Sequence, residues 1–282
     1  MRVDEHTIQV GGASVFYRAA PASGVCRLFL HSVPTSSDDW TPFLERGGGI
    51  APDLIGFGRS AKAHSLDYSF DAYAHFVDQF LRTLGVDRVK LVGHGWGAAI
   101  GLVFAQRHPE RIERLVICNA IPLLESFAWP GLVRWLRRPV IGELLMGSTN
   151  QRVLAKTLRR GSVRPDAWPQ ERIADVWEQF DQGTQRATLR LQRSVDERGL
   201  AAAGAGLREL DRPALVVWGT RDPWLDPAFA DGYAAQLPRA SLQLVADAGH
   251  WPWLDQPAMI EVVAEFLDTP HEPGGSSAGP AQ

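Results

Sequence analysis

The sequence lacks most of the features that would place it outside the ordinary globular proteins. Its 282 residues include only two cysteines, Cys26 and Cys118, which excludes a disulfide-rich scaffold and a cysteine-based zinc site. The 29 Lys and Arg nearly balance the 32 Asp and Glu, and a net charge of −3 favours neither nucleic acid nor an anionic membrane as partner. No apolar run approaches the roughly 18 residues of a membrane span, and no signal-peptide core is present. We therefore expect a reduced, cytoplasmic protein.

What the sequence does contain is a series of short apolar runs that alternate with helical patterns. Most of the runs are continuously apolar, which is typical of parallel strands buried on both faces. The order predicts an α/β protein with a doubly wound, mostly parallel eight-stranded sheet. The expected strands are 7–10, 13–18, 27–30, 49–52, 89–92, 115–118, 214–218 and 242–245, and the expected helices are 70–84, 98–108 and 257–267.

A long segment, residues 122–210, interrupts this alternation. It contains no apolar run of the earlier kind, is helical in pattern and is rich in Arg and Trp. We expect it to form a helical lid over the carboxyl edge of a sheet built from residues 1–121 and 211–269. The tail, residues 270–282, is rich in Pro, Gly and Ser, and we expect it to be disordered.

The most specific motif is the stretch 91–101, LVGHGWGAAIG, in which an apolar strand leads into a helix. Gly93 and Gly97 permit a tight strand-to-helix turn, and Gly95 lies at its tip, at the N-terminus of the helix. Other motifs are HSVPTSSDDW at 31–40, APDLIGFGRS at 51–60, HPER at 108–111 and DAGH at 247–250. Together these motifs resemble the α/β-hydrolase superfamily over nearly the whole chain outside the lid. The elbow most resembles the branch of haloalkane dehalogenases and epoxide hydrolases.

Gly95 departs from the pattern of that branch. The branch carries Asp at the tip of the elbow and esterases carry Ser, whereas glycine has no atom that could form a covalent intermediate. Either the chain has lost the nucleophile and works without it, or glycine has replaced the nucleophile of an ordinary hydrolase. Ser32 lies in a different loop, so we do not expect it to stand in for the missing side chain.

The other two members of the family's catalytic triad are present. Asp222 matches the acid and His250 the histidine of the resemblance, and a carboxylate on one imidazole nitrogen would leave the other nitrogen free to act as a base or an acid. Asp226 is better explained as a helix N-cap. Asn119 stands where some dehalogenases keep their acid, but it is neutral, so the acid is assigned to Asp222.

The resemblance also suggests a set of oxyanion and substrate-binding residues. Backbone N–H groups of the oxyanion loop and of Trp96 would point at a developing negative charge. Ser32 stands where the family usually has Gly, and its hydroxyl either joins the site or is a steric substitution. Val33 stands where some dehalogenases hold a halide-binding Asn, and it cannot donate a hydrogen bond. The lid tryptophans either line a pocket or only fill the core of the lid. The full set is His31, Ser32, Val33, Trp96, Trp129, Trp168 and Trp177.

These residues together predict an enzyme that lacks the covalent nucleophile. The Asp222–His250 dyad would catalyse elimination, isomerisation, cyclisation or hydration of a small, largely apolar substrate. One alternative is an ordinary haloalkane dehalogenase or esterase whose Asp or Ser at position 95 is replaced. The other is a non-catalytic member that only binds a ligand. We expect no metal, no cofactor, no nucleic acid and no membrane partner, and a monomer or homodimer.

Overall fold

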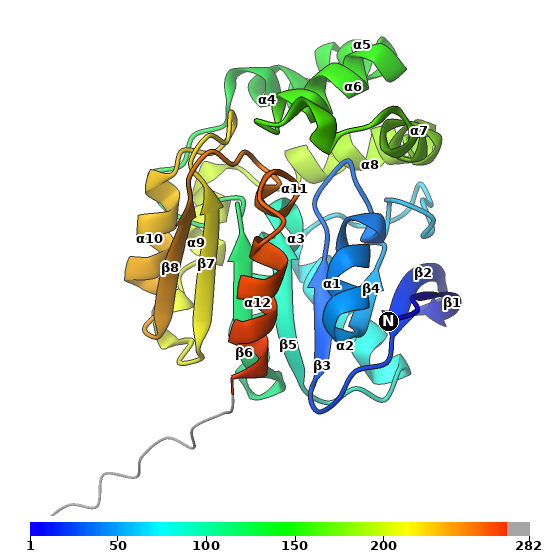
Figure 1. Cartoon of the computed structure of the whole chain (residues 1–282). Helices are drawn as coiled ribbons and strands as arrows, with labels where there is room; N and C mark the ends of the chain where they lie inside the picture. Colours follow the sequence, from blue (N-terminus) through cyan, green and yellow to red (C-terminus); the bar gives the residue numbers. More distant parts are fainter. Residues whose placement is uncertain (270–282) are drawn as a thin grey trace, which may run out of the picture.

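The fold is an eight-stranded sheet with helices on both faces and a further group of helices above one edge (Figure 1). The structure is a computed structural model and describes residues 1–269; the tail predicted to be disordered, residues 270–282, lies outside the described residues. The strand order is β1-β2-β4-β3-β5-β6-β7-β8. The pairs β1/β2 and β2/β4 are antiparallel, and the other neighbours are parallel. The predicted α/β class and its mostly parallel sheet are confirmed.

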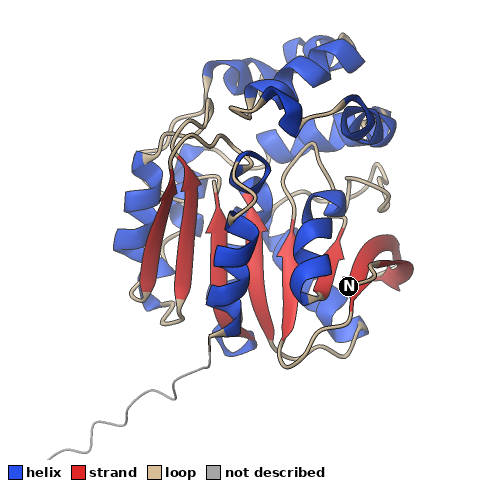
Figure 2. Cartoon of the chain, viewed as in Figure 1, coloured by secondary structure: helices blue, strands red, loops and turns tan. Residues whose placement is uncertain are grey.

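The central strands are buried on both faces, as their continuous apolar runs predicted. Helices cover the two faces of the sheet, so apolar side chains are needed on both (Figure 2). The edge strand β1 is largely exposed and mostly polar. The strands are β1 (Asp4–Val10), β2 (Ala13–Ala20), β3 (Cys26–Leu30), β4 (Gly49–Pro52), β5 (Val89–His94), β6 (Ile112–Cys118), β7 (Ala214–Gly219) and β8 (Ala240–Val245).

The core helices divide between the two faces of the sheet. Buried side chains of α1 and α12 belong to one hydrophobic cluster, and those of α2, α3 and α10 belong to the other. Two details differ from expectation: α1 lies between β3 and β4, where no helix was predicted, and α3 begins at Gly95 instead of residue 98. The core helices are α1 (Thr41–Gly47), α2 (Phe70–Thr83), α3 (Gly95–Arg107), α10 (Ala228–Gln236), α11 (Pro252–Asp255) and α12 (Met259–Asp268).

The remaining α-helices, which we call the cap helices, lie between β6 and β7 in sequence; α4 to α8 lie above the sheet in Figure 1, and α9 lies lower, beside β7. Their apolar side chains are not a separate core, since Leu158 of α6 and Ile173 of α7 join the hydrophobic cluster that includes Trp251. The cap helices are α4 (Gly131–Leu136), α5 (Ile141–Gly147), α6 (Gln151–Arg160), α7 (Gln170–Gln179), α8 (Gln182–Arg193) and α9 (Glu197–Ala203). Short 3₁₀ helices span Ser37–Trp40, Pro109–Arg111, Pro165–Ala167 and Leu207–Glu209.

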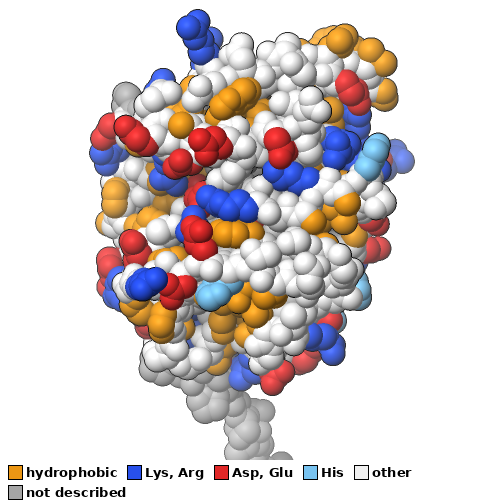
Figure 3. All heavy atoms as spheres, turned by 90° about the vertical axis from the view of Figure 1, so that its right-hand side faces the viewer, with side chains coloured by type: hydrophobic (Ala, Val, Ile, Leu, Met, Phe, Trp, Pro, Cys, Tyr) orange, Lys and Arg blue, Asp and Glu red, His pale blue; other side chains and the backbone are white. Residues whose placement is uncertain are grey.

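The surface has little segregation of charge on the side drawn in Figure 3. Basic and acidic side chains are interspersed there, and hydrophobic side chains form several separate patches from the top to the bottom of this face. Within residues 1–269, none of the helices combines the length and the apolar character needed to cross a membrane.

Candidate active site

Two loops meet at the carboxyl edge of the sheet because their strands are neighbours. β3 and β5 are parallel, and Leu30 is paired with Gly93. Ser32 and Gly95 each follow that pair by two residues, so the register brings them to the same place although 63 positions separate them in the sequence.

Gly95 has no open space beside it. Its φ is +51°, the left-handed conformation that glycine adopts most readily, and it is the first residue of α3. A Cβ atom at Gly95 would lie 2.1 Å from Ser32 Oγ and 3.6 Å from His250 Nε2. The location of Ser32 in a different loop, for which it was not expected to stand in for the missing side chain, therefore does not keep Ser32 away from position 95. Its hydroxyl lies inside the volume that such a side chain would fill.

Several hydrogen bonds fix the Ser32 loop. The Trp96 N–H donates to Ser32 Oγ at 3.2 Å. The Ser32 carbonyl accepts from His31 Nδ1 at 2.7 Å and from Thr35 Oγ1 at 3.1 Å. His31 Nε2 accepts from the Leu54 N–H at 2.8 Å, so both ring nitrogens of this buried histidine are engaged by the backbone. His31 therefore holds the loop in place, and Ser32 presents its hydroxyl to the site.

The structure brings Asp222 and His250 together. His250 Nδ1 donates to Asp222 Oδ2 at 2.6 Å, and Asp222 is fully buried while His250 is only slightly exposed. Asp222 Oδ1 accepts the N–H groups of Trp224 and Leu225 at 2.8 and 3.2 Å. These bonds satisfy the buried carboxylate and fix the imidazole, with His250 Nε2 3.6 Å from the position that a Cβ at Gly95 would take.

Asn119 completes this arrangement, a role that the sequence analysis missed. Its Nδ2 donates to Asp222 Oδ2 at 2.7 Å, and its Oδ1 accepts the Gly219 N–H at 3.0 Å. Its position at the end of β6 was the available signal, but only its lack of charge was considered. Asp226 caps the following turn by accepting the Ala228 N–H at 2.9 Å.

Aromatic rings surround His250 on several sides. The ring centroids of Trp224, Trp251 and His94 lie 5.0, 4.9 and 4.5 Å from that of His250. The two tryptophans were also missed, although Trp251 follows His250 directly in the sequence. His94 Nε2 donates to the His250 carbonyl at 2.8 Å. Burial, reinforced by the nearby His250, lowers the pKa of His94 well below its ordinary value, so His94 is a neutral packing neighbour.

A buried carboxylate ties this region to a cap helix. Asp39 Oδ2 accepts from Thr35 Oγ1 at 2.6 Å and from Trp251 Nε1 at 3.2 Å. Arg172 of α7 forms an ion pair with Asp39 Oδ1 at 3.0 Å and lies over the ring of Trp168. This network connects the Ser32 loop, the residue after His250 and the cap.

The other predicted binding residues differ in how close they lie to the dyad. Trp96 and Trp129 are buried and stacked, with centroids 5.9 Å apart. Trp168 is fully buried and packs 4.9 Å from Trp251, one residue away from His250. Trp177, by contrast, packs against Phe180 within the cap, and no contact with the dyad is seen in the described part of the chain. Val33 is partly buried and packs against the core.

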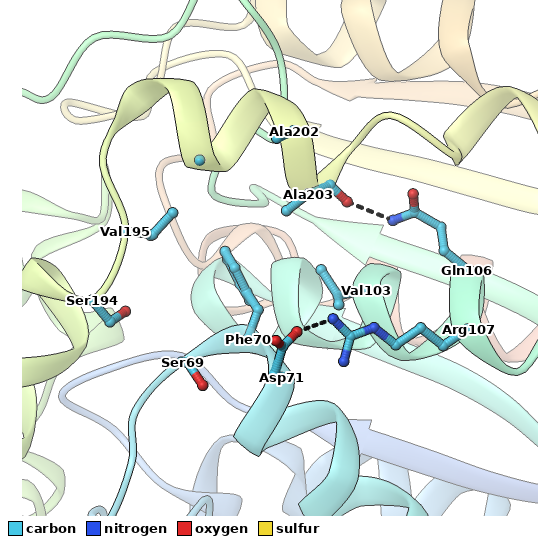
Figure 4. Close-up of a pocket in the computed structure, with 11 residues that line it drawn as sticks. Ser69, Phe70, Asp71, Val103, Gln106, Arg107, Ser194, Val195, Ala202 and Ala203 are labelled. Carbon is cyan, nitrogen blue, oxygen red and sulfur yellow. Dashed lines mark hydrogen bonds and ion pairs between the residues drawn. The ribbon is translucent and has the colours of Figure 1, made fainter.

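A cavity of about 430 Å³ lies away from the dyad, between the core and α9 (Figure 4). Arg107 pairs with Asp71 in its wall, and Gln106 donates to the Ala203 carbonyl at 2.9 Å. Phe70, which also lines the cavity, packs 6.1 Å from Trp96. No member of the dyad lines this cavity. We place the candidate site at the dyad, because catalysis depends on an oriented titratable group more than on the size of a hollow.

The described residues offer no group of three or more His, Cys, Asp or Glu side chains that could hold a metal ion.

Comparison with known proteins identifies the class to which this fold and site belong. A family model described as alpha/beta hydrolase fold matches residues 28–257. The chain belongs to the α/β-hydrolase family, whose members related to this chain are enzymes of hydrolase and decarboxylase type.

Individual relatives carry several different activities. An uncharacterized protein of Mycobacterium tuberculosis is 30% identical over 271 residues, which cover 88% of this chain and 76% of that protein. A cis-3-alkyl-4-alkyloxetan-2-one decarboxylase of Xanthomonas campestris is 27% identical over 93% of this chain and 94% of its own. The haloalkane dehalogenase DbeA of Bradyrhizobium elkani superposes with a TM-score of 0.82 at 27% identity, covering 94% of this chain and 98% of that one.

Proposed function

We propose that this chain is an enzyme in which His250, oriented by Asp222, transfers a proton to or from a small, largely apolar substrate. The observation that carries the proposal is the 2.6 Å bond between a fully buried carboxylate and His250 Nδ1. Such a bond fixes the tautomer and stabilises the protonated ring, and a protein that only binds a ligand needs neither.

The proposal includes the loss of a nucleophile at position 95. Gly95 offers no side-chain atom, so an ester intermediate of the dehalogenase kind does not form there. Without a covalent step, the dyad supports elimination, isomerisation, cyclisation or addition of water. A nucleophile from another element would add acyl transfer to this list.

The apolar surroundings support a substrate with little charge. His250 is flanked by Trp224 and Trp251, and Trp129 extends the aromatic surface from the cap side through its stacking on Trp96. Substrates of the named relatives, haloalkanes, epoxides and 3-alkyl-4-alkyloxetan-2-ones, are small and mainly apolar and form a suitable first panel.

The test compares the wild-type protein with His250→Ala on this panel, extended with p-nitrophenyl esters. Proton transfer by a positioned side chain contributes about 10²–10⁴-fold, and we expect His250→Ala to lose turnover by that factor. His75→Ala is the matched control, because His75 is an exposed residue of α2 outside the site. Equal turnover by His250→Ala and the wild type would contradict the proposal.

A further inference from the structure

We infer that Ser32 is the nucleophile of this site and that the substrate is a carboxylic ester with a small apolar acyl group. The inference rests on the proposed Asp222–His250 dyad and names the group that the dyad activates. It starts from a double departure from the family pattern: the elbow has Gly95 where a nucleophile is usual, and the oxyanion loop has Ser32 where Gly is usual. The nucleophilic side chain is thus absent from one loop, and a hydroxyl is present in the other.

The geometry connects these two departures, because the Ser32 side chain lies where a side chain at residue 95 would lie. Ser32 Oγ lies 2.1 Å from the position of a Cβ at residue 95, far closer than any non-bonded contact, so it occupies the place of that side chain. His250 Nε2 lies 3.6 Å from the same point. The Ser32 hydroxyl and the free nitrogen of the dyad therefore both lie around the position of a side chain at residue 95.

The surroundings of Ser32 Oγ favour its deprotonated form. The Trp96 N–H donates to it, and that N–H belongs to the first turn of α3, a helix of 13 residues whose N-terminus carries partial positive charge. The loop is rigid, since the Ser32 carbonyl is bound by His31 and Thr35. A serine hydroxyl that accepts from an amide N–H and lies near a general base can lose its proton as it attacks.

The reaction balances without any further reagent. Ser32 Oγ attacks the ester carbonyl carbon while its proton passes to His250 Nε2, and the carbonyl π electrons move to oxygen. The oxyanion collapses, the alkoxide leaves with the proton from His250, and an acyl ester of Ser32 remains. Water that has lost a proton to His250 then attacks the acyl carbon, and Ser32 regains its proton as the carboxylic acid departs. The Trp96 N–H, which donates to Ser32 Oγ, stabilises the negative charge that develops on this oxygen as its proton leaves.

The test uses two probes on the full chain, phenylmethylsulfonyl fluoride and p-nitrophenyl acetate. We expect a sulfonyl or acetyl adduct on the peptide that contains Ser32, detected by mass spectrometry. We also expect ester turnover to fall at least about 10²-fold in Ser32→Ala and Ser32→Gly. Ser32→Gly guards against misfolding, because it adds no atoms, and a thermal melt checks both variants. Ser241→Ala, at the exposed edge strand β8, is the control and should retain the adduct and the turnover.

The outcomes separate the inference from the proposed function. Loss of turnover in folded Ser32→Gly and in His250→Ala, with the adduct on Ser32, supports both. Turnover that survives in Ser32→Gly but is lost in His250→Ala overturns the inference and leaves the non-covalent reactions of the dyad. The absence of any adduct on Ser32 with both probes also overturns it. Turnover that survives in both variants contradicts the inference and the proposed function alike.

Discussion

The two halves of the site differ in how closely they follow the pattern of the family. The half formed by Asp222 and His250 keeps both residue types and the hydrogen bond that orients them. The other half, formed by Gly95 and Ser32, has the hydroxyl on the loop opposite to the usual one. In the proposed mechanism, the half that transfers protons is unchanged, and the half that attacks the substrate is rearranged.

The two halves differ because proton transfer by an imidazole and attack by a hydroxyl have different structural requirements. An imidazole works only when a partner fixes its tautomer and direction, and four hydrogen bonds to the Asp222 carboxylate serve that end. A hydroxyl needs only to lie at one point near the base. Because β3 and β5 are parallel neighbours, the loops after Leu30 and Gly93 both reach that point, and either can supply the oxygen.

The largest loss of turnover should come from a substitution in the Asp222–His250 half of the site. Asp222→Asn removes the charge that stabilises protonated His250 and allows the wrong tautomer, so we expect turnover to fall by about 10²–10⁴-fold. Asp226→Asn is the matched control, since Asp226 only caps the turn before α10 and should change turnover less than about twofold. Steady-state kinetics of both variants measure this difference in turnover. Comparable activity in the two would show that Asp222 does not serve His250.

A smaller effect should come from forcing a side chain into the rearranged half. Gly95→Ala places a Cβ in a left-handed conformation, which costs about 1–2 kcal/mol, and against Ser32 Oγ, which adds about 1–3 kcal/mol. We expect the free energy of unfolding in urea to fall by about 2–5 kcal/mol. In a Ser32→Gly background the overlap disappears, and the same change should cost only about 1–2 kcal/mol.

Gly12→Ala is a control for the backbone conformation alone. Gly12 has a φ of +83°, but a Cβ there would meet no atom within 4 Å. Gly12→Ala should lower the free energy of unfolding by the same amount as Gly95→Ala does in the Ser32→Gly background. A cost for Gly95→Ala that does not depend on residue 32 would show that the two positions do not share one space.

Much of the fold was predictable because burial on both faces of a sheet imposes a simple pattern. The run 49–52 gave β4 at its observed bounds, and the helical spacing before Gly85 gave α2 within one residue of its end. The helix α1 was missed because it is only seven residues long and directly follows the loop motif at 31–40. Short helices depend on tertiary packing more than on their own sequence.

The site was predictable only where the sequence carries a motif. The Asp222–His250 pair follows from two such motifs, whereas the meeting of Ser32 with Gly95 depends on the register of two strands. Register is fixed by packing and cannot be read from either loop alone. The same limit explains why Asn119 was seen only as an unsuitable acid and not as a partner of Asp222.

The smallest effect concerns His94, which lies between the two halves of the site. Because burial lowers the pKa of His94 in the folded protein, only the unfolded chain takes up this proton as the pH falls below about 6.5. The contribution of this residue to the free energy of unfolding should therefore be complete above that pH and decrease below it, by up to about 1.4 kcal/mol per pH unit.

His94→Gln tests this expectation. The variant keeps an N–H for the His250 carbonyl but does not titrate, so its free energy of unfolding in urea should change less between pH 7.5 and 5 than that of the wild type. His75→Gln, at an exposed position of α2, should keep the wild-type slope. An unchanged slope in His94→Gln would mean that His94 accepts a proton in the folded state and that the centre of the site is more polar than its packing indicates.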